Sequence, residues 1–236
     1  MKYTLDFKQS VAFEIMASSF ILNSLQKYNI TQESIEEYFN ENETQKHECI
    51  KSLSQLKKTV DKKGGVENLV MFLSGMGGTG KSEVIKAFVF FVENICGFFG
   101  WNHDSDTVKI TALTGTAACQ IPNGKTLHSQ ACLNMKKIRQ TSIDSWKSTK
   151  ILIIDEVSFM DEDTIQKLDK NLRLLKESDV LFGGVLIVFV ADFFQMLPVK
   201  GKPLFKCNTL QFSSINRAVF LNVSHRFEND PDLVKL

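Results

Sequence analysis

The chain of 236 residues carries 28 Lys and Arg against 27 Asp and Glu, and 43% of its residues are hydrophobic. This composition indicates an ordinary globular protein of one large or two small domains and excludes low-complexity disorder and collagen. No run of about 20 uncharged apolar residues is present, so we expect no membrane-spanning helix. Charged residues interrupt the N-terminal segment, which is unlike a secretory signal. The five cysteines lack metal-binding spacing and favour free thiols in a reducing, intracellular compartment.

The N-terminal quarter of the chain predicts helices and a polar insertion. Apolar residues at near-helical spacing predict a helix over residues 6–26. A capping box at 34–37 predicts a short helix that bears Phe39, and residues 40–65 favour an exposed insertion with a helical part around 50–56. We therefore expect an N-terminal segment of residues 1–66 before the core.

From residue 69 onward, short apolar runs alternate with helical patterns. The runs predict strands at 69–73, 108–113, 151–154, 185–190 and 219–223, with helices at 81–98, 117–120 and 161–177 between them. Strands that alternate with helices predict a parallel sheet flanked by helices on both faces. The predicted fold is therefore α/β over residues 67–236.

A phosphate-binding loop follows the first predicted strand and opens a helix. The sequence Gly75-Met76-Gly77-Gly78-Thr79-Gly80-Lys81-Ser82 matches GxxxxGK[ST]. Glycines let backbone N–H groups turn toward phosphates, and the helix N-terminus adds partial positive charge. Lys81 would reach the β- and γ-phosphates, and the Ser82 hydroxyl would bind Mg²⁺. ATP and Mg²⁺ are therefore the expected cofactors, held by Gly75, Gly77, Gly78, Thr79, Gly80, Lys81 and Ser82.

Two further strand ends carry polar residues. Asp155, after the strand at 151–154, is a candidate Mg²⁺ ligand, and Glu156 is a candidate general base for the attacking water. Gln195, after the strand at 185–190, would contact the γ-phosphate. Parallel strands end at one edge of the sheet, where open α/β folds bind ligands. The pattern indicates a P-loop nucleotide hydrolase, and the missing NKxD motif disfavours a GTPase.

With its additional motifs, the sequence resembles the PIF (petite integration frequency) DNA helicases of superfamily one, subfamily B. The resemblance extends from about residue 5 to the end and is interrupted by the insertion at 27–65. The family's opening motif resembles 5–13, and its next two resemble Thr111–Ala118 and Thr126–Ser129. Its later motifs resemble residues 155–160, the Phe-Gly-Gly and strand of 182–199, and 221–227. This chain departs from the family pattern at Leu113, Ala191, Met196-Leu197 and Phe227, and Phe159 is inserted or replaces a neighbour.

The resemblance implies an N-terminal RecA-like motor domain. In it, Gln9 would read adenine and Arg226 would contact the γ-phosphate, and Lys81, Asp155, Glu156 and Gln195 would complete the catalytic set. It implies single-stranded DNA contacts at Thr114, Gly115, His128 and Ser129. It also implies a monomeric helicase that moves from 5′ to 3′ in repair, recombination and telomere maintenance, in the nucleus or mitochondrion of a eukaryote.

Relatives use two RecA-like domains, and the second is absent here. We therefore expect a fragment or a truncated gene product that binds ATP with Mg²⁺, hydrolyses it slowly and unwinds nothing by itself. Three alternatives remain: a RecD-type exonuclease-associated ATPase, a helicase remnant from a mobile element that binds partners, and an oligomeric AAA-type ATPase. A basic stretch at 133–150 is a candidate phosphate-contacting surface.

Overall fold

The computed structural model describes residues 3–27, 68–99, 101, 103–121, 124–135, 137–192, 202, 206 and 209–225. The chain divides into two compact units, one of Met1–Met16 with Leu69–Leu236 and one of Ala17–Asn68. Helix α1 (Phe7–Lys27) begins in the first unit and ends in the second. The helices predicted at 34–39 and around 50–56 lie outside the described residues, and the boundary predicted between 66 and 67 stays a prediction.

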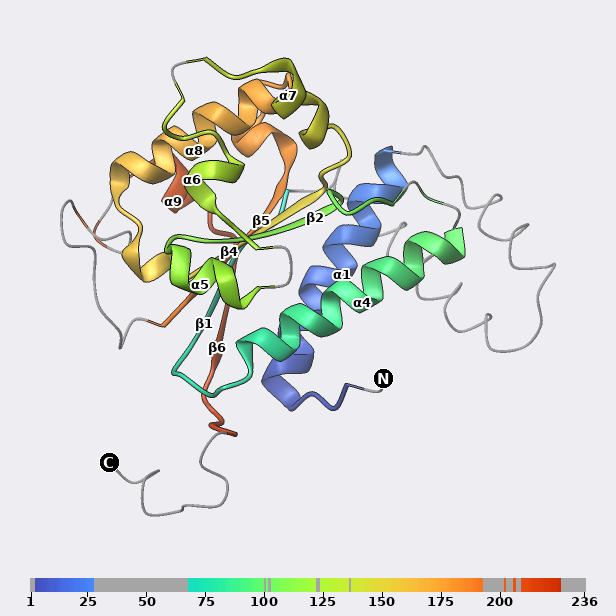
Figure 1. Cartoon of the computed structure of the whole chain (residues 1–236). Helices are drawn as coiled ribbons and strands as arrows, with labels where there is room; N and C mark the ends of the chain where they lie inside the picture. The colour runs from blue at the N-terminus through green and yellow to red at the C-terminus, as the bar shows by residue number, and fades with distance from the viewer. Residues whose placement is uncertain are drawn as a thin grey trace. The chain divides into compact units, whose positions relative to one another are not determined.

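A six-stranded sheet forms the centre of the first unit (Figure 1), with the strand order β3-β2-β4-β5-β1-β6. Every neighbouring pair of strands is parallel. The strands are β1 (Val70–Gly75), β2 (Val108–Ala112), β3 (Lys125–Thr126), β4 (Ile151–Asp155), β5 (Leu186–Ala191) and β6 (Arg217–Leu221). The predicted parallel α/β sheet is confirmed.

Helices lie on both faces of this sheet, with α8 and α9 on one face and α4 on the other (Figure 1). All residues of β1 and β5 are buried, as expected for central strands covered on both sides. The helices of the first unit after β1 are α4 (Lys81–Phe99), α5 (Gly115–Gln120), α6 (Leu127–Gln130), α7 (Gln140–Trp146), α8 (Glu162–Leu175) and α9 (Leu210–Ser213), with 3₁₀ turns η1 (Val157–Phe159) and η2 (Leu181–Gly184).

The core between α8 and the sheet follows from helical periodicity. Leu168 and Leu172 of α8 are fully buried in one cluster with Leu152, Ile154 and Phe189 of the central strands. Full burial of such side chains contributes about 1.5–3 kcal/mol each. Asp161 caps the N-terminus of α8 by accepting a 2.9 Å hydrogen bond from the Thr164 N–H. This core fixes the position at which β4 and β5 end.

Some predicted bounds and elements differ from the structure. The last strand runs from Arg217 to Leu221, two residues earlier than predicted. Among the described strands it pairs with β1 alone, at the edge of the sheet, and it exposes Phe220, so its apolar residues do not mark its bounds. Sequence analysis missed β3, α6, α7 and α9. These elements have two, four, seven and four residues, so they are too short to carry a periodic apolar pattern.

Candidate functional site

The phosphate-binding loop connects β1 to α4 at the C-terminal edge of the sheet. Lys81, the first residue of α4, directs its ammonium back over the loop and donates to the carbonyl oxygens of Gly75 and, at 3.0 Å, Met76. Gly78 and Gly80 have φ angles of 83° and 81°. These left-handed conformations favour glycine and shape the loop around an anion. The loop therefore has the backbone and the cation that a nucleotide polyphosphate requires.

The loop is packed against its own threonine and against α1. Thr79 is fully buried, and its hydroxyl donates a 2.8 Å hydrogen bond to the carbonyl of Met76. A Cβ at Gly75 would lie 2.4 Å from Thr79 Oγ1, so a glycine is required there by space. The Thr79 carbonyl accepts a buried hydrogen bond of 3.1 Å from Gln9 Nε2. The first turn of α1 therefore supports the loop directly.

Gln9 also forms a capping box with Asp6 at the start of α1. The Gln9 N–H donates to Asp6 Oδ1 at 2.9 Å, and the Asp6 N–H donates to Gln9 Oε1 at 3.0 Å. Among the described residues, the Gln9 amide thus has two partners, and one hydrogen on Nε2 is directed at neither of them. The expectation that this amide reads adenine stays a prediction.

The segment after β6 contacts both the loop and the capping box. The His225 N–H donates to the Gly78 carbonyl at 3.0 Å, and His225 Nε2 lies 3.0 Å from Asp6 Oδ2. Burial by itself would raise the pKa of Asp6, but hydrogen bonds from Gln9 and His225 hold it below its usual value. Sequence analysis missed the loop contact of His225 and its pairing with Asp6, because only the fold brings together residues 219 positions apart.

Two carboxylates at neighbouring strand ends face the lysine. Asp155 ends β4, and Asp192 follows β5. Burial lowers the pKa of Lys81, and the charges of Asp192 and Asp155 offset part of that effect. Burial also raises the pKa of Asp155; the hydrogen bond from the Glu156 N–H opposes this rise, and the Glu156 charge adds to it. A divalent cation would relieve this crowding of negative charge, so Asp155 and the exposed Ser82 hydroxyl fit the predicted Mg²⁺ site.

Glu156, the predicted general base, has a left-handed backbone with φ 57° and ψ 37°. Strained backbone of this kind persists where the surrounding structure enforces it, often at functional sites. Its N–H donates to Asp155 Oδ1 at 2.8 Å, and its carboxylate accepts a 2.7 Å hydrogen bond from the Thr114 hydroxyl. Two of the predicted site residues, one catalytic and one for DNA, are therefore in direct contact.

The residues predicted to contact DNA lie at the same edge of the sheet. Thr114 and Gly115 follow β2, while His128 and Ser129 lie in α6 directly after β3, which pairs with β2. Ser129 and Lys125 line a small pocket of about 210 Å³. Gln195 and Arg226, the predicted γ-phosphate contacts, lie outside the described residues.

The basic stretch at 133–150 does not form a continuous charged surface among its described residues. Lys150 is 5% exposed, and its ammonium lies 5.2 Å from the centre of the Trp101 ring. Lys147 pairs with Asp144 at 2.7 Å. The prediction of a phosphate-contacting surface is therefore wrong for Lys150, whose long side chain packs in the core, and Lys137 and Arg139 remain candidates.

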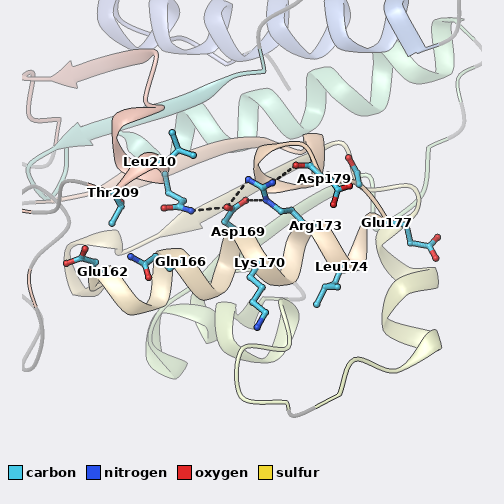
Figure 2. Close-up of a pocket in the computed structure, with 12 residues that line it drawn as sticks. Glu162, Gln166, Asp169, Lys170, Arg173, Leu174, Glu177, Asp179, Thr209 and Leu210 are labelled. Carbon is cyan, nitrogen blue, oxygen red and sulfur yellow. Dashed lines mark hydrogen bonds and ion pairs between the residues drawn. The ribbon is translucent and has the colours of Figure 1, made fainter.

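A larger pocket, of about 900 Å³, lies between α8 and α9 (Figure 2). Its central carboxylate, Asp169, is 5% exposed and accepts hydrogen bonds from the Phe182 N–H at 2.7 Å, from Gln211 at 2.9 Å and from two nitrogens of Arg173. Arg173 also donates to the Asp179 carbonyl. Because these donors all serve to join α8, η2 and α9, we interpret Asp169 as a structural residue.

Among the described residues, no group of three or more His, Cys, Asp or Glu is arranged to hold a metal ion. No helix in that part of the chain is long and apolar enough to cross a membrane. Cys96, Cys119 and Cys132 are free thiols.

Comparisons of sequence identify proteins that are similar to this chain. A family model described as PIF1-like helicase matches residues 47–219. The ATP-dependent DNA helicase PIF1 of Emericella nidulans is 36% identical over 140 residues, which cover 55% of this chain and 18% of the relative. The ATP-dependent DNA helicase RRM3 of Saccharomyces cerevisiae is 34% identical over 143 residues, covering 56% and 19%. The chain thus spans about a fifth of the length of the curated relatives it matches.

Comparisons with solved structures also identify Pif1 helicases as similar to this chain. The crystal structure of Pif1 helicase from Candida albicans matches with a TM-score of 0.58 at 25% identity, covering 76% of this chain and 41% of that chain. The structure of Pif1 helicase from Bacteroides in complex with ADP-AlF3 and ssDNA has the same TM-score and identity, covering 76% and 43%. Gln9 and Arg226 lie outside the range matched by the family model.

Proposed function

Because the chain belongs to the PIF1-like helicase family, we propose that it is the ATP-binding RecA-like domain of an ATP-dependent DNA helicase. The observation that carries this proposal is the convergence of Lys81, Asp155 and Glu156 at one edge of a parallel sheet. The same edge bears Thr114 and the residues of α6, so a DNA strand there would lie beside the nucleotide.

Each residue of the site has a proposed role in ATP hydrolysis. The backbone amides of the loop and the Lys81 ammonium bind the polyphosphate, and Gln9 reads the adenine edge with its remaining amide hydrogen. Ser82 and Asp155 would hold Mg²⁺, which when bound supplies charge neutralisation at the phosphate oxygens. Glu156 accepts a proton from the attacking water, and Gln195 and Arg226 contact the γ-phosphate.

Single-stranded DNA is the proposed substrate of the motor. Thr114, Gly115, His128 and Ser129 would contact its backbone largely without regard to sequence. One solved relative is described as a complex with ssDNA, which supports this choice. We further propose translocation from 5′ to 3′ by a monomer, with roles in repair, recombination and telomere maintenance in the nucleus or mitochondrion.

Full activity would require a second RecA-like domain. The curated relatives are about five times longer than the matched part, which leaves room for one. In related phosphoryl transfer, an arginine supplied in trans increases the rate by about 10³–10⁵. We therefore expect slow hydrolysis and no unwinding by this chain alone.

The test is hydrolysis of ATP with protein in excess, in the presence and absence of oligothymidine. We expect slow, Mg²⁺-dependent turnover that DNA accelerates, and no turnover above background in Lys81→Ala or Glu156→Gln. Hydrolysis that survives both substitutions would contradict the proposed function, because it would have to arise at a different site.

A further inference from the structure

The contact between Thr114 and Glu156 joins the two halves of the site. Their side chains meet at 2.7 Å across 42 positions of sequence. The pairing of β2 with β4 explains the contact, because it sets Ala112 opposite Asp155. Residues just beyond these two positions are therefore neighbours at the sheet edge.

The Thr114 hydroxyl has one proton, and the structure determines where it is directed. Thr114 Oγ1 accepts a 3.2 Å hydrogen bond from the Ala117 N–H as the cap of α5. An amide N–H cannot accept, so the hydroxyl hydrogen is not used in that bond. An ionised carboxylate can only accept, so the Thr114 proton is donated to Glu156 Oε2.

This bond affects the ability of Glu156 to act as a base. The bond occupies Oε2 and holds the side chain toward α5, while the backbone N–H of Glu156 donates to Asp155 Oδ1. A general base held in this way is less reactive toward water than one that is released.

We propose that Thr114 is a positioning residue that holds Glu156 inactive until a DNA phosphate takes its hydroxyl proton as a hydrogen-bond partner. This inference rests on the proposed function, which places single-stranded DNA at Thr114. One hydroxyl cannot donate to Glu156 and to a phosphate oxygen at once, so the two acceptors compete. Binding of the strand breaks the bond to Oε2, forms a bond to the phosphate, and releases Glu156 without any covalent change.

If DNA weakens the bond between Thr114 and Glu156, then that bond must weaken DNA binding to the same extent. DNA affinity measured without nucleotide therefore tests the competition. If Glu156 competes with DNA, then Glu156→Ala should increase the affinity for oligothymidine by about 3- to 10-fold, the size of one hydrogen bond. Glu156→Ala also removes a negative charge, which by itself increases the affinity for DNA. A double-mutant cycle with Thr114→Val isolates the competition, because the charge effect persists in that background and the competition does not.

The affinity would be measured by fluorescence anisotropy of labelled oligothymidine. We expect the gain from Glu156→Ala to be several-fold larger with Thr114 present than with Val at that position. Glu156→Ala leaves the cap of α5 intact, so the gain with Thr114 present is measured on an unaltered α5. Equal gains in both backgrounds would overturn the inference.

Hydrolysis of ATP gives a second readout. Thr114→Val should increase the rate without DNA by about 3- to 10-fold, while the rate at saturating DNA stays near that of the natural chain. The KM for ATP should not change, since Thr114 does not contact the P-loop in the described structure. Thr114→Ser should restore the natural behaviour, and Thr116→Val, the same change on an exposed position of α5, should have no effect.

The outcomes separate this inference from the proposed function. If Thr114→Val lowers only DNA affinity, or lowers hydrolysis with and without DNA, Thr114 does not restrain Glu156 and the inference fails. If the natural chain binds ATP and hydrolyses it at a rate that DNA does not change, the inference also fails while the nucleotide site stands. If the chain binds no ATP, both fail.

Discussion

The side chain of Gln9 donates a buried hydrogen bond of 3.1 Å to the backbone carbonyl of Thr79, 70 positions further along the chain. The same side chain accepts from the N–H of Asp6, the residue directly before α1. The phosphate-binding loop is thus supported by a segment that lies before the core in sequence. This arrangement makes loop geometry depend on the start of α1.

We predict that Gln9→Ala lowers the affinity for inorganic tripolyphosphate by about 3- to 10-fold, because one buried hydrogen bond to the loop is lost. Adenine contact by the remaining amide hydrogen would make the loss for ATP larger. Calorimetric titration with both ligands measures the two effects separately, with Gln140→Ala, at an exposed position of α7, as the control. Unchanged tripolyphosphate affinity would show that Gln9 does not support the loop.

A second prediction concerns Gly80, which has φ of 81° and whose added Cβ would lie 2.2 Å from Gln9 Nε2. Gly80→Ala therefore strains the backbone and displaces Gln9, and we expect it to destabilise the fold by about 1–3 kcal/mol. Gly97→Ala in α4 is the matched control. Nothing lies within 4 Å of its added Cβ, so it should stabilise the helix by about 0.5–1 kcal/mol.

Denaturant unfolding of both glycine variants would measure these changes. Nucleotide affinity should fall in Gly80→Ala and stay constant in Gly97→Ala. Equal effects of the two substitutions would mean that the loop conformation described here does not require glycine at position 80.

The third prediction is a dependence of stability on pH through Asp169. Burial alone would raise the pKa of Asp169, but hydrogen bonds from Arg173, Gln211 and the Phe182 N–H outweigh it and lower the pKa. A carboxyl whose pKa is lower in the folded state than in the unfolded state stabilises the fold above the unfolded value of about 4. That contribution is lost as the pH falls through the lowered folded pKa.

Asp169→Asn should therefore cost about 1.5–3 kcal/mol at neutral pH, as expected for hydrogen bonds to a charged group, and less below about pH 4. Unfolding free energies measured across the acid range would show the two curves converging. The control is Asp163→Asn, at an exposed position of the same helix, for which we expect a small change. Parallel curves for Asp169→Asn and the natural chain would contradict the linkage.

The central strands and the phosphate-binding loop were predictable from sequence because their signals are local. A continuous apolar run defines β1, β4 and β5, and the glycine and lysine spacing of the loop follows β1 directly. The sequence also located Asp155 and Glu156, since each follows a predicted strand.

The contacts between these motifs were not predictable, because they depend on strand register and strand order. The bond from Thr114 to Glu156 requires β2 to pair with β4, and the four donors to Asp169 come from three separate elements. Asp169 has the sequence pattern of an ordinary helix position. The prediction that Lys150 lies on a phosphate-contacting surface was wrong for a related reason. A Lys can pack its long side chain along apolar groups, and only the fold places Trp101 beside Lys150.

The central claim is that the loop around Lys81 binds ATP, and calorimetric titration with ATP and Mg²⁺ tests it most directly. The comparison is between the natural chain, Lys81→Ala, and Lys86→Ala, whose exposed ammonium pairs with Glu83 on the same helix. We predict that Lys81→Ala weakens binding by at least about 100-fold, because a charge-assisted contact to phosphate is lost, and that Lys86→Ala binds as the natural chain does. Equal affinities for all three proteins, or no binding by the natural chain, would contradict the account.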